Sequence, residues 1–210
     1  MKSQLGDVEQ EIRLGEKEVA LFGYGSLLSR KSMESTLGRE YQYPWPPAVC
    51  SLPNFKRTWN ALEPNDSSYY ARTESGILTP THIIYLNVTA CPTHAVNGVV
   101  LVLREDDIAL FDAREAPTYE RVNITGQLRG VRLTQGHGYM YSAKPEWLLG
   151  DTRSPQWAAI RQSYVDKVNE GVSQLGEQFG LEYDKSTDPV PRELVINDNI
   201  EKQLLEDPEQ

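Results

Sequence analysis

Two short segments of the sequence carry residue types that could bind an anion and move a proton. The first is Phe22-Gly-Tyr-Gly-Ser-Leu27, in which alternating glycines follow the apolar run Val19–Phe22. Because glycine tolerates tight turns, successive backbone N–H groups there could point at one carboxylate or oxyanion. Taken alone, the segment is better explained as an ordinary β-turn or bulge.

The second segment ends in Glu115, within Leu110-Phe-Asp-Ala-Arg-Glu-Ala-Pro. Glu115 is expected to close a helix, where the negative end of the helix dipole disfavours a carboxylate and raises its pKa. In a half-buried cleft such a carboxyl group could act as a general acid or base near neutral pH. Taken alone, a surface glutamate paired with Arg114 or Arg121 is the better explanation.

Other common chemical motifs are missing from the chain. It has no phosphate-binding loop of the Gly-x-x-x-x-Gly-Lys type. His82, His94 and His137 have no metal-ligand spacing, and Cys50 and Cys91 read as incidental small apolar residues. A nucleophilic Cys–His pair stays open, although nothing in the spacing favours it. We therefore expect no metal site and no cofactor.

Together, the two segments resemble the gamma-glutamylcyclotransferase-like family. The resemblance rests on the Gly-Tyr-Gly-Ser-Leu strand end, a Leu/Phe-Asp-x-x-Glu segment about 90 residues later, and the Tyr-x-Arg that follows. It extends from Val19 to Phe179, through Phe55-Lys-Arg-Thr-Trp-Asn and Gly138-Tyr-Met-Tyr. The family usually has glycine after the glutamate, whereas this chain has Ala116-Pro117.

The resemblance implies a site and a reaction. Glu115 would be the catalytic base, and the substrate-binding residues would be Phe22, Gly23, Tyr24, Gly25, Ser26 and Leu27. Backbone amides of the glycine turn would hold the α-carboxylate of a small γ-glutamyl substrate. The substrate's own α-amine would then attack its γ-carbonyl, releasing 5-oxoproline and an amine or amino acid. Tyr119 and Arg121 would brace Glu115, while Tyr141 and Trp157 are candidates for the pocket wall.

Two alternatives accompany this interpretation. In the first, the reaction is the same but the substrate is undecided among γ-glutamyl amines, glutathione and other γ-glutamylated intermediates, which differ in their leaving group. The other is a non-catalytic small-molecule binding module on the same fold, because a fold does not by itself confer activity.

The hydrophobic pattern predicts the elements that position these residues. Strands are expected over 19–22, 55–60, 82–88, 98–103, 119–124, 130–133 and 138–141. A helix is expected from Ser29 to Leu37 between a serine N-cap and the C-cap Gly38, and another over Glu105–Glu115. A long last helix is expected from the apolar stripe between Trp157 and Phe179, beginning near Pro155. This content predicts an α+β fold, a small mixed or antiparallel β-barrel with surrounding helices.

Composition narrows the class of partner. The 210 residues include 30 acidic and 21 basic side chains, a net charge of −9, which argues against nucleic-acid binding. No apolar run approaches a membrane span, and the charged N-terminus lacks a signal-peptide pattern, so we expect a cytoplasmic protein. The oligomeric state cannot be read from the sequence.

The charge is concentrated near the ends of the chain. Residues 1–18 hold five acids and three bases, and residues 184–210 hold eight acids and three bases. We therefore expect a charged N-terminal segment over 1–18, a domain over 19–183, and an acidic C-terminal arm over 184–210.

Overall fold

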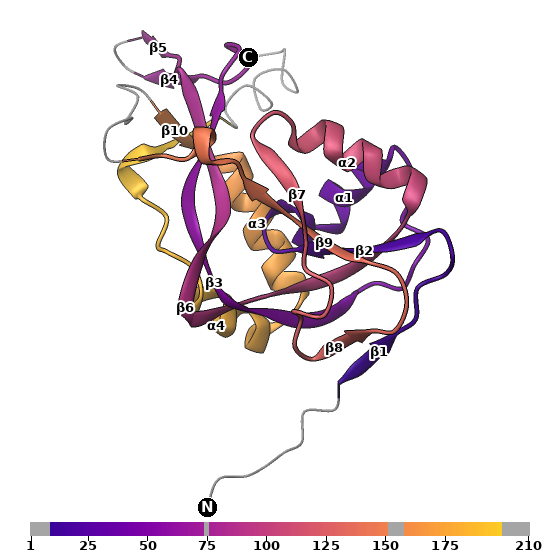
Figure 1. Ribbon diagram of the computed structural model, residues 1–210. Helices are drawn as coiled ribbons and strands as arrows, with labels where there is room; N and C mark the ends of the chain where they lie inside the picture. Colours follow the sequence, from indigo (N-terminus) through magenta and orange to yellow (C-terminus); the bar gives the residue numbers. More distant parts are fainter. Residues whose placement is uncertain (1–8, 74–75, 151–157, 199–210) are drawn as a thin grey trace, which may run out of the picture.

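The computed structural model describes residues 9–73, 76–150 and 158–198. Its centre is a mixed seven-stranded sheet with the order β11-β10-β6-β2-β9-β7, and β3 pairs with β6 beside this path (Figure 1). The strands are β2 (Glu18–Gly23), β3 (Ala48–Pro64), β6 (His82–Arg104), β7 (Tyr119–Asn123), β9 (Gly138–Ala143), β10 (Ala158–Arg161) and β11 (Val195–Ile196). The described residues also form two separate two-stranded sheets. One pairs β1 (Gln10–Ile12) with β8 (Val131–Leu133), and the other pairs β4 (Ala71–Thr73) with β5 (Gly76–Leu78).

The longest strands in the described part of the chain, β3 and β6, hold the sheet together. They run antiparallel over nearly their whole length, and bulges between Pro53 and Phe55 and between Trp59 and Ala61 shift their register. β6 also pairs antiparallel with β2, and β9 lies parallel to β2 on the other side. The predicted mixed α+β class is confirmed. The described strands show no closed barrel, so that detail stays a prediction.

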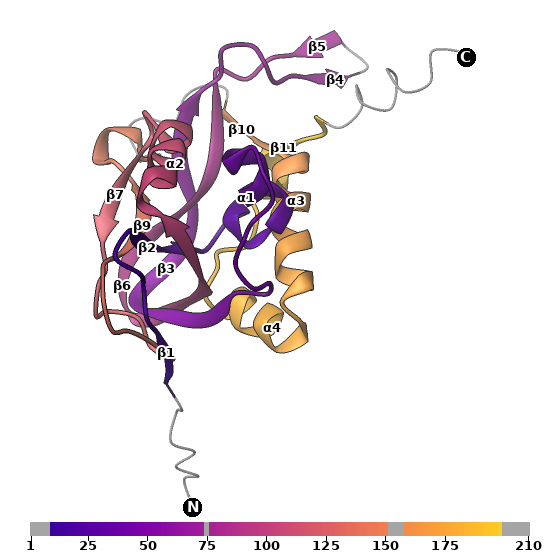
Figure 2. The ribbon, with the colours of Figure 1, turned by 90° about the vertical axis from the view of Figure 1, so that its right-hand side faces the viewer.

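Four α-helices lie within the described residues: α1 (Arg30–Leu37), α2 (Ile108–Glu115), α3 (Gln162–Gln174) and α4 (Glu177–Lys185). Short 3-10 helices are η1 (Ser26–Leu28), η2 (Glu105–Asp107), η3 (Pro145–Trp147) and η4 (Arg192–Leu194). Figure 2 shows α1, α3 and α4 on the same side of the sheet.

The first two helices follow the sequence prediction closely. Ser29 caps α1 by accepting a hydrogen bond from the Ser32 N–H at 3.3 Å. Gly38 ends α1 in the left-handed conformation at φ 66°. α2 ends at Glu115 because Ala116 is already extended before Pro117.

The single long last helix expected from Trp157 to Phe179 is wrong. Ala158–Arg161 forms β10, which pairs with β6 and β11, and the helical stretch is divided between α3 and α4. The break lies at Gly176, whose φ of 94° is a backbone conformation that an α-helix cannot contain. The expected helix start at Pro155 and Trp157 lies outside the described residues.

The terminal segments are built into the body farther than their charge suggests. β1 pairs with β8, and Leu14 just after it is buried. Near the other end, Ser186 and Ile196 are buried and β11 extends the main sheet. Packed residues therefore occur on both sides of residue 18 and of residue 184. The division into three segments stays a prediction, and residues 199–210 are not described.

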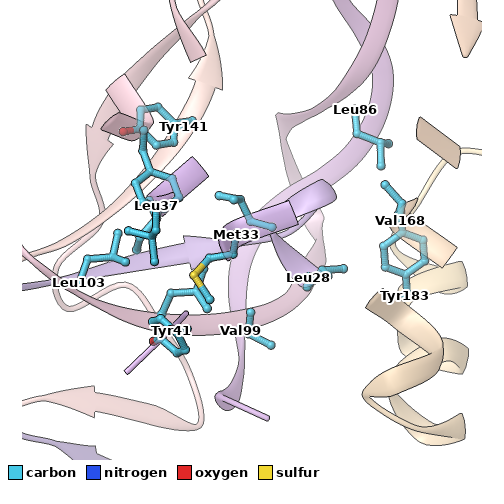
Figure 3. Close-up of a cluster of buried hydrophobic side chains, with 14 of the residues drawn as sticks. Leu28, Met33, Leu37, Tyr41, Leu86, Val99, Leu103, Tyr141, Val168 and Tyr183 are labelled. Carbon is cyan, nitrogen blue, oxygen red and sulfur yellow. The ribbon is translucent and has the colours of Figure 1, made fainter. Parts of the chain in front are cut away.

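The core has two main parts, one on each side of the sheet, and a small third cluster of Ala71, Ala159 and Ile196. Figure 3 shows the part beneath the helices, where Leu28, Met33, Val99 and Val168 come together. The other part includes Phe22 and Tyr24. Because Tyr24 belongs to one part and Leu28 to the other, the glycine turn between them is anchored on both sides.

Candidate active site

The glycine turn leaves backbone N–H groups unused. β2 ends at Gly23, and η1 begins at Ser26. The carbonyls of Gly25 and Ser26 accept hydrogen bonds from Leu28 and Ser29. In contrast, within the described part of the chain no backbone hydrogen bond occupies the N–H groups of Gly25 and Ser26. These two donors are available to an anion.

Gly25 is glycine because its side-chain position faces the pocket. A Cβ atom there would lie 3.2 Å from the Tyr164 hydroxyl. Gly23 lies beneath the turn instead, where a Cβ would come within 3.1 Å of the Leu27 Cβ. Any side chain at either position would move an element that shapes the site.

Glu115 is brought to the same place by the end of α2. Its side chain is 16% exposed, and its Oε1 lies 3.3 Å from the Arg114 Nε. The Arg114 guanidinium donates through Nη2 to the Ser26 Oγ at 2.8 Å and through Nη1 to the Thr36 Oγ1 at 2.6 Å. Arg114 thus ties the acid, the glycine turn and α1 together.

Burial sets the protonation of Glu115. Loss of hydration raises the pKa of its carboxyl group, the Arg114 cation opposes this shift, and the nearby Glu63 carboxylate adds to it. Arg121, the other predicted partner, pairs with Asp112 at 3.2 Å instead. Glu115 is therefore a largely buried carboxyl group with a raised pKa rather than a solvated surface glutamate.

Four tyrosines, Tyr24, Tyr119, Tyr141 and Tyr164, belong to the wall around these groups. The Tyr24 hydroxyl donates to the Tyr141 carbonyl at 2.8 Å, and the Tyr119 hydroxyl donates to the Leu86 carbonyl at 2.8 Å. Tyr164 packs its ring edge-on against Tyr85, with 4.9 Å between centroids. Among described residues, no hydrogen-bond partner engages the Tyr164 hydroxyl, so it can bind a ligand.

The result is a small inner pocket of about 40 Å³. Its lining is Phe22, Tyr24, Gly25, Ser26, Leu27, Leu86, Glu115, Tyr119, Tyr141 and Tyr164. The structure therefore brings Glu115 together with five of the six predicted binding residues, while Gly23 supports them from below. Tyr164 was missed, because its spacing within the apolar stripe predicts a core position.

A wider outer pocket of about 230 Å³ adjoins the inner one. The two share Ser26, Glu115, Tyr119 and Tyr164. The outer pocket adds groups of both charge signs and further aromatic rings: Glu63, Tyr69, Tyr85, Arg114, Arg161 and Lys167. A ligand bound at the turn could extend into this polar space.

The remaining candidate chemistry lies elsewhere. Within the described ranges no three His, Cys, Asp or Glu side chains are grouped as a metal ion would require. The Cys91 Sγ lies 3.1 Å from the His94 Nδ1, so these two residues do meet. Neither of them lines the inner or the outer pocket. No helix in the described part of the chain is long and apolar enough to cross a membrane.

Comparison with solved structures places the fold. One similar structure is described as a gamma-glutamyl cyclotransferase, with a TM-score of 0.55 and 14% identity over 90% of this chain and 99% of that one. Another is an uncharacterised human protein, with a TM-score of 0.56 and 14% identity over the same shares. No protein-family model and no curated protein matches the sequence. The chain thus has the gamma-glutamyl cyclotransferase-like fold, as the sequence resemblance predicts.

Proposed function

We propose that the protein is a gamma-glutamyl cyclotransferase-type enzyme, which cleaves a γ-glutamyl amide and releases 5-oxoproline with an amine or amino acid. One observation carries the proposal. A buried carboxyl group with a raised pKa, Glu115, lines the same small pocket as the glycine turn with its unused N–H donors. A binding module would need the donors but not the base.

Binding would begin at the turn. The N–H groups of Gly25 and Ser26 would hold the substrate's α-carboxylate, as backbone donors hold anions elsewhere. The Tyr164 hydroxyl opposite Gly25 would orient the glutamyl group. Because this group is short and flexible, the pocket must fold it so that its α-nitrogen approaches its own γ-carbonyl.

The reaction then needs proton transfer and little else. Ionised Glu115 takes a proton from the α-ammonium, and the freed amine attacks the γ-carbonyl carbon to form the ring C–N bond. As the original amide C–N bond breaks, the leaving nitrogen receives that proton from Glu115. The ring nitrogen gives up a second proton, which reaches the leaving amine by the same route. Since both reacting groups belong to one molecule, their tethering supplies much of the rate enhancement.

The outer pocket would receive the leaving group. It shares Glu115 with the inner pocket and is also lined by Glu63, Arg161 and Lys167. Groups of both signs favour a polar leaving group over a purely aliphatic one. We therefore place γ-glutamyl amino acids, γ-glutamyl amines and glutathione in the same substrate panel.

Activity of purified protein on that panel tests the proposal. Glu115→Gln keeps the shape of the side chain but removes the base, so 5-oxoproline release should fall by roughly 10²- to 10⁴-fold. Glu120→Gln is the matched control, because Glu120 is exposed on the neighbouring strand β7. Wild-type turnover by Glu115→Gln would remove Glu115 from the mechanism. Tight binding of a γ-glutamyl compound without any product would identify a binding module instead.

A further inference from the structure

Arg57 is a fully buried cation directly behind the glycine turn. It lies on β3 and is 0% exposed. Its Nε donates to the Tyr24 carbonyl at 2.7 Å, which is the carbonyl at the centre of the turn. The guanidinium also packs 4.2 Å from the centroid of the Tyr183 ring. The side chain therefore joins the central sheet to the turn and to α4.

All the hydrogen-bond acceptors around Arg57 are neutral. Nη1 donates to the Ser186 Oγ at 2.8 Å and to the Thr187 Oγ1 at 3.3 Å. Nη2 donates to the Asn97 Oδ1 at 3.1 Å and to the Asn97 carbonyl. Within the described residues, no carboxylate lies within ion-pair distance of this guanidinium.

A buried charge without a counter-ion is costly to the fold. Burial lowers the pKa of Arg57 to about 10, with the Tyr183 and Tyr24 groups opposing the shift, so the guanidinium stays charged at neutral pH. Natural proteins usually pair such an ion with an opposite charge. Packing alone does not explain why the protein keeps a buried cation without a counter-ion next to the proposed anion site.

The geometry of the peptide group links Arg57 to the pocket. The bond between Tyr24 and Gly25 is trans, so the Tyr24 carbonyl and the Gly25 N–H point in opposite directions. Because Arg57 holds the carbonyl from behind, the N–H points away from Arg57. The Gly25 N–H is one of the two unused donors, and Gly25 lines the inner pocket.

We propose that Arg57 is the positioning residue of the anion site: it fixes the Tyr24–Gly25 peptide with its N–H toward the pocket, and the substrate's α-carboxylate is its missing counter-ion. This inference rests on the proposed function. It adds the residue that makes the turn prefer a negatively charged ligand group. Arg57 touches the turn and not the reacting atoms.

A carboxylate added next to Arg57 tests the inference without removing Arg57. Thr187 is suitable because it contacts Nη1, is only partly buried, and borders a separate cavity of about 300 Å³ that leaves room for a new side chain. Thr187→Asp would supply an internal counter-ion, and Thr187→Asn is the matched neutral control. Relative to Thr187→Asn, we expect Thr187→Asp to raise KM for an accepted γ-glutamyl substrate about tenfold, because a partly screened charge attraction is lost. Because ground-state and transition-state binding weaken alike, kcat should change little.

The melting temperature provides the second readout. An internal counter-ion should make Thr187→Asp melt at a higher temperature than Thr187→Asn, so stability and substrate affinity should move in opposite directions. A higher melting temperature with an unchanged KM would show that Arg57 is merely structural and would overturn the inference. If Thr187→Asp does not fold, Arg57→Lys and Arg57→Gln replace the pair. Arg57→Lys keeps the positive charge, so its KM should stay within a few-fold of the KM of the parent, whereas Arg57→Gln should have a higher KM. Equal KM values for these two variants would count against the inference.

Ligand binding separates this inference from the proposed function. Titration calorimetry with the γ-glutamyl panel measures Kd even where no product forms. If the parent protein binds a γ-glutamyl compound without turning it over, the proposed reaction fails, while a weaker Kd for Thr187→Asp would still support Arg57. If the parent binds no member of the panel, both proposals fail.

Discussion

At the scale of single residues, Glu115 combines two opposing requirements. The proposed reaction begins with the ionised carboxylate, while burial favours the protonated acid. Arg114 meets both requirements in part. Its Nε lies 3.3 Å from the Glu115 Oε1 and stabilises the negative charge of the carboxylate, while hydrogen bonds to Ser26 and Thr36 hold the guanidinium in place. A group balanced in this way can accept a proton early in the reaction and return it later.

The raised pKa of Glu115 predicts how activity depends on pH. The base form exists above the pKa, so kcat/KM should rise with pH through the pKa of Glu115 in the free enzyme and then level off. Its midpoint should lie above 4.5, the ordinary value of a glutamate carboxyl group. A pH–rate profile on the best substrate of the panel measures it. An acid-side midpoint at or below that ordinary value would show that burial does not tune this group.

The two motifs were predictable from the sequence, but the residues that connect them were not. The glycine turn and Glu115 carry their chemistry in residue type and local spacing. Arg57 and Tyr164 act through contacts with segments far away in the chain, and nothing in their local spacing reveals a partner. The pairing of Arg114 with Glu115 is expected from their adjacency, but the bonds of Arg114 to Ser26 and Thr36 are not. Tyr164 shows this most clearly, because its place in an apolar stripe is typical of a core residue.

At the scale of elements, the position of the glycine turn depends on how closely α3 approaches it. A Cβ atom on Gly171 would lie 2.6 Å from the Leu28 carbonyl carbon and 2.7 Å from the Ser29 nitrogen. Both are backbone atoms of the segment that follows the turn. α3 therefore fixes η1 by direct contact with its backbone, and the turn has little freedom to move.

Gly171→Ala should disturb both stability and activity. The added methyl group must push α3 and η1 apart, and overpacking of this kind costs roughly 1–3 kcal/mol of unfolding free energy. Since η1 begins at Ser26, kcat/KM should fall as well. The matched control is Gly180→Ala, because a Cβ there meets only the Val172 Cγ1 at 3.6 Å, which is an ordinary contact. Urea unfolding and steady-state assays would contradict this account if both alanine variants behaved alike.

Elements fixed by local signals were predictable, and those fixed by distant pairing were not. The caps of α1 and the proline after α2 act within a few residues, so their helices follow the sequence prediction. β10 continues the apolar spacing of the following helix, and its pairing with His82 and Ile83 is invisible in that spacing. The strand was therefore mistaken for the first turns of a longer helix.

At the scale of the whole molecule, the acidic C-terminal segment is part of the body as far as Asp198. The Asp198 side chain is 6% exposed and pairs with the Arg161 Nε at 2.7 Å. Its Oδ1 also accepts a hydrogen bond from the Ser163 N–H at 2.8 Å, at the start of α3. Burial alone would raise the pKa of Asp198, but the bonds from Ser163 and Arg161 outweigh it and lower the pKa. Charge counting cannot identify such a contact, since it treats every acid in the segment alike.

Removing this contact should destabilise the protein. Asp198→Ala leaves Arg161 without its buried partner and α3 without its N-terminal acceptor, so the unfolding free energy should fall by about 3 kcal/mol. Asp198→Asn retains an acceptor for Ser163 and should lose less. Urea denaturation of the two variants and the parent measures the difference. A loss below about 0.5 kcal/mol for Asp198→Ala, the usual range for surface substitutions, would show that the segment is not locked to the body.

The central claim is that the substrate's own α-amine attacks its γ-carbonyl with Glu115 as the base, and product identity tests it most directly. For the best γ-glutamyl compound of the panel, mass spectrometry should find 5-oxoproline and the released amine in equal amounts. The same compound with its α-amine acetylated should give no product, because the nucleophile is blocked. Release of glutamate in place of 5-oxoproline, or turnover of the acetylated compound, would contradict the account.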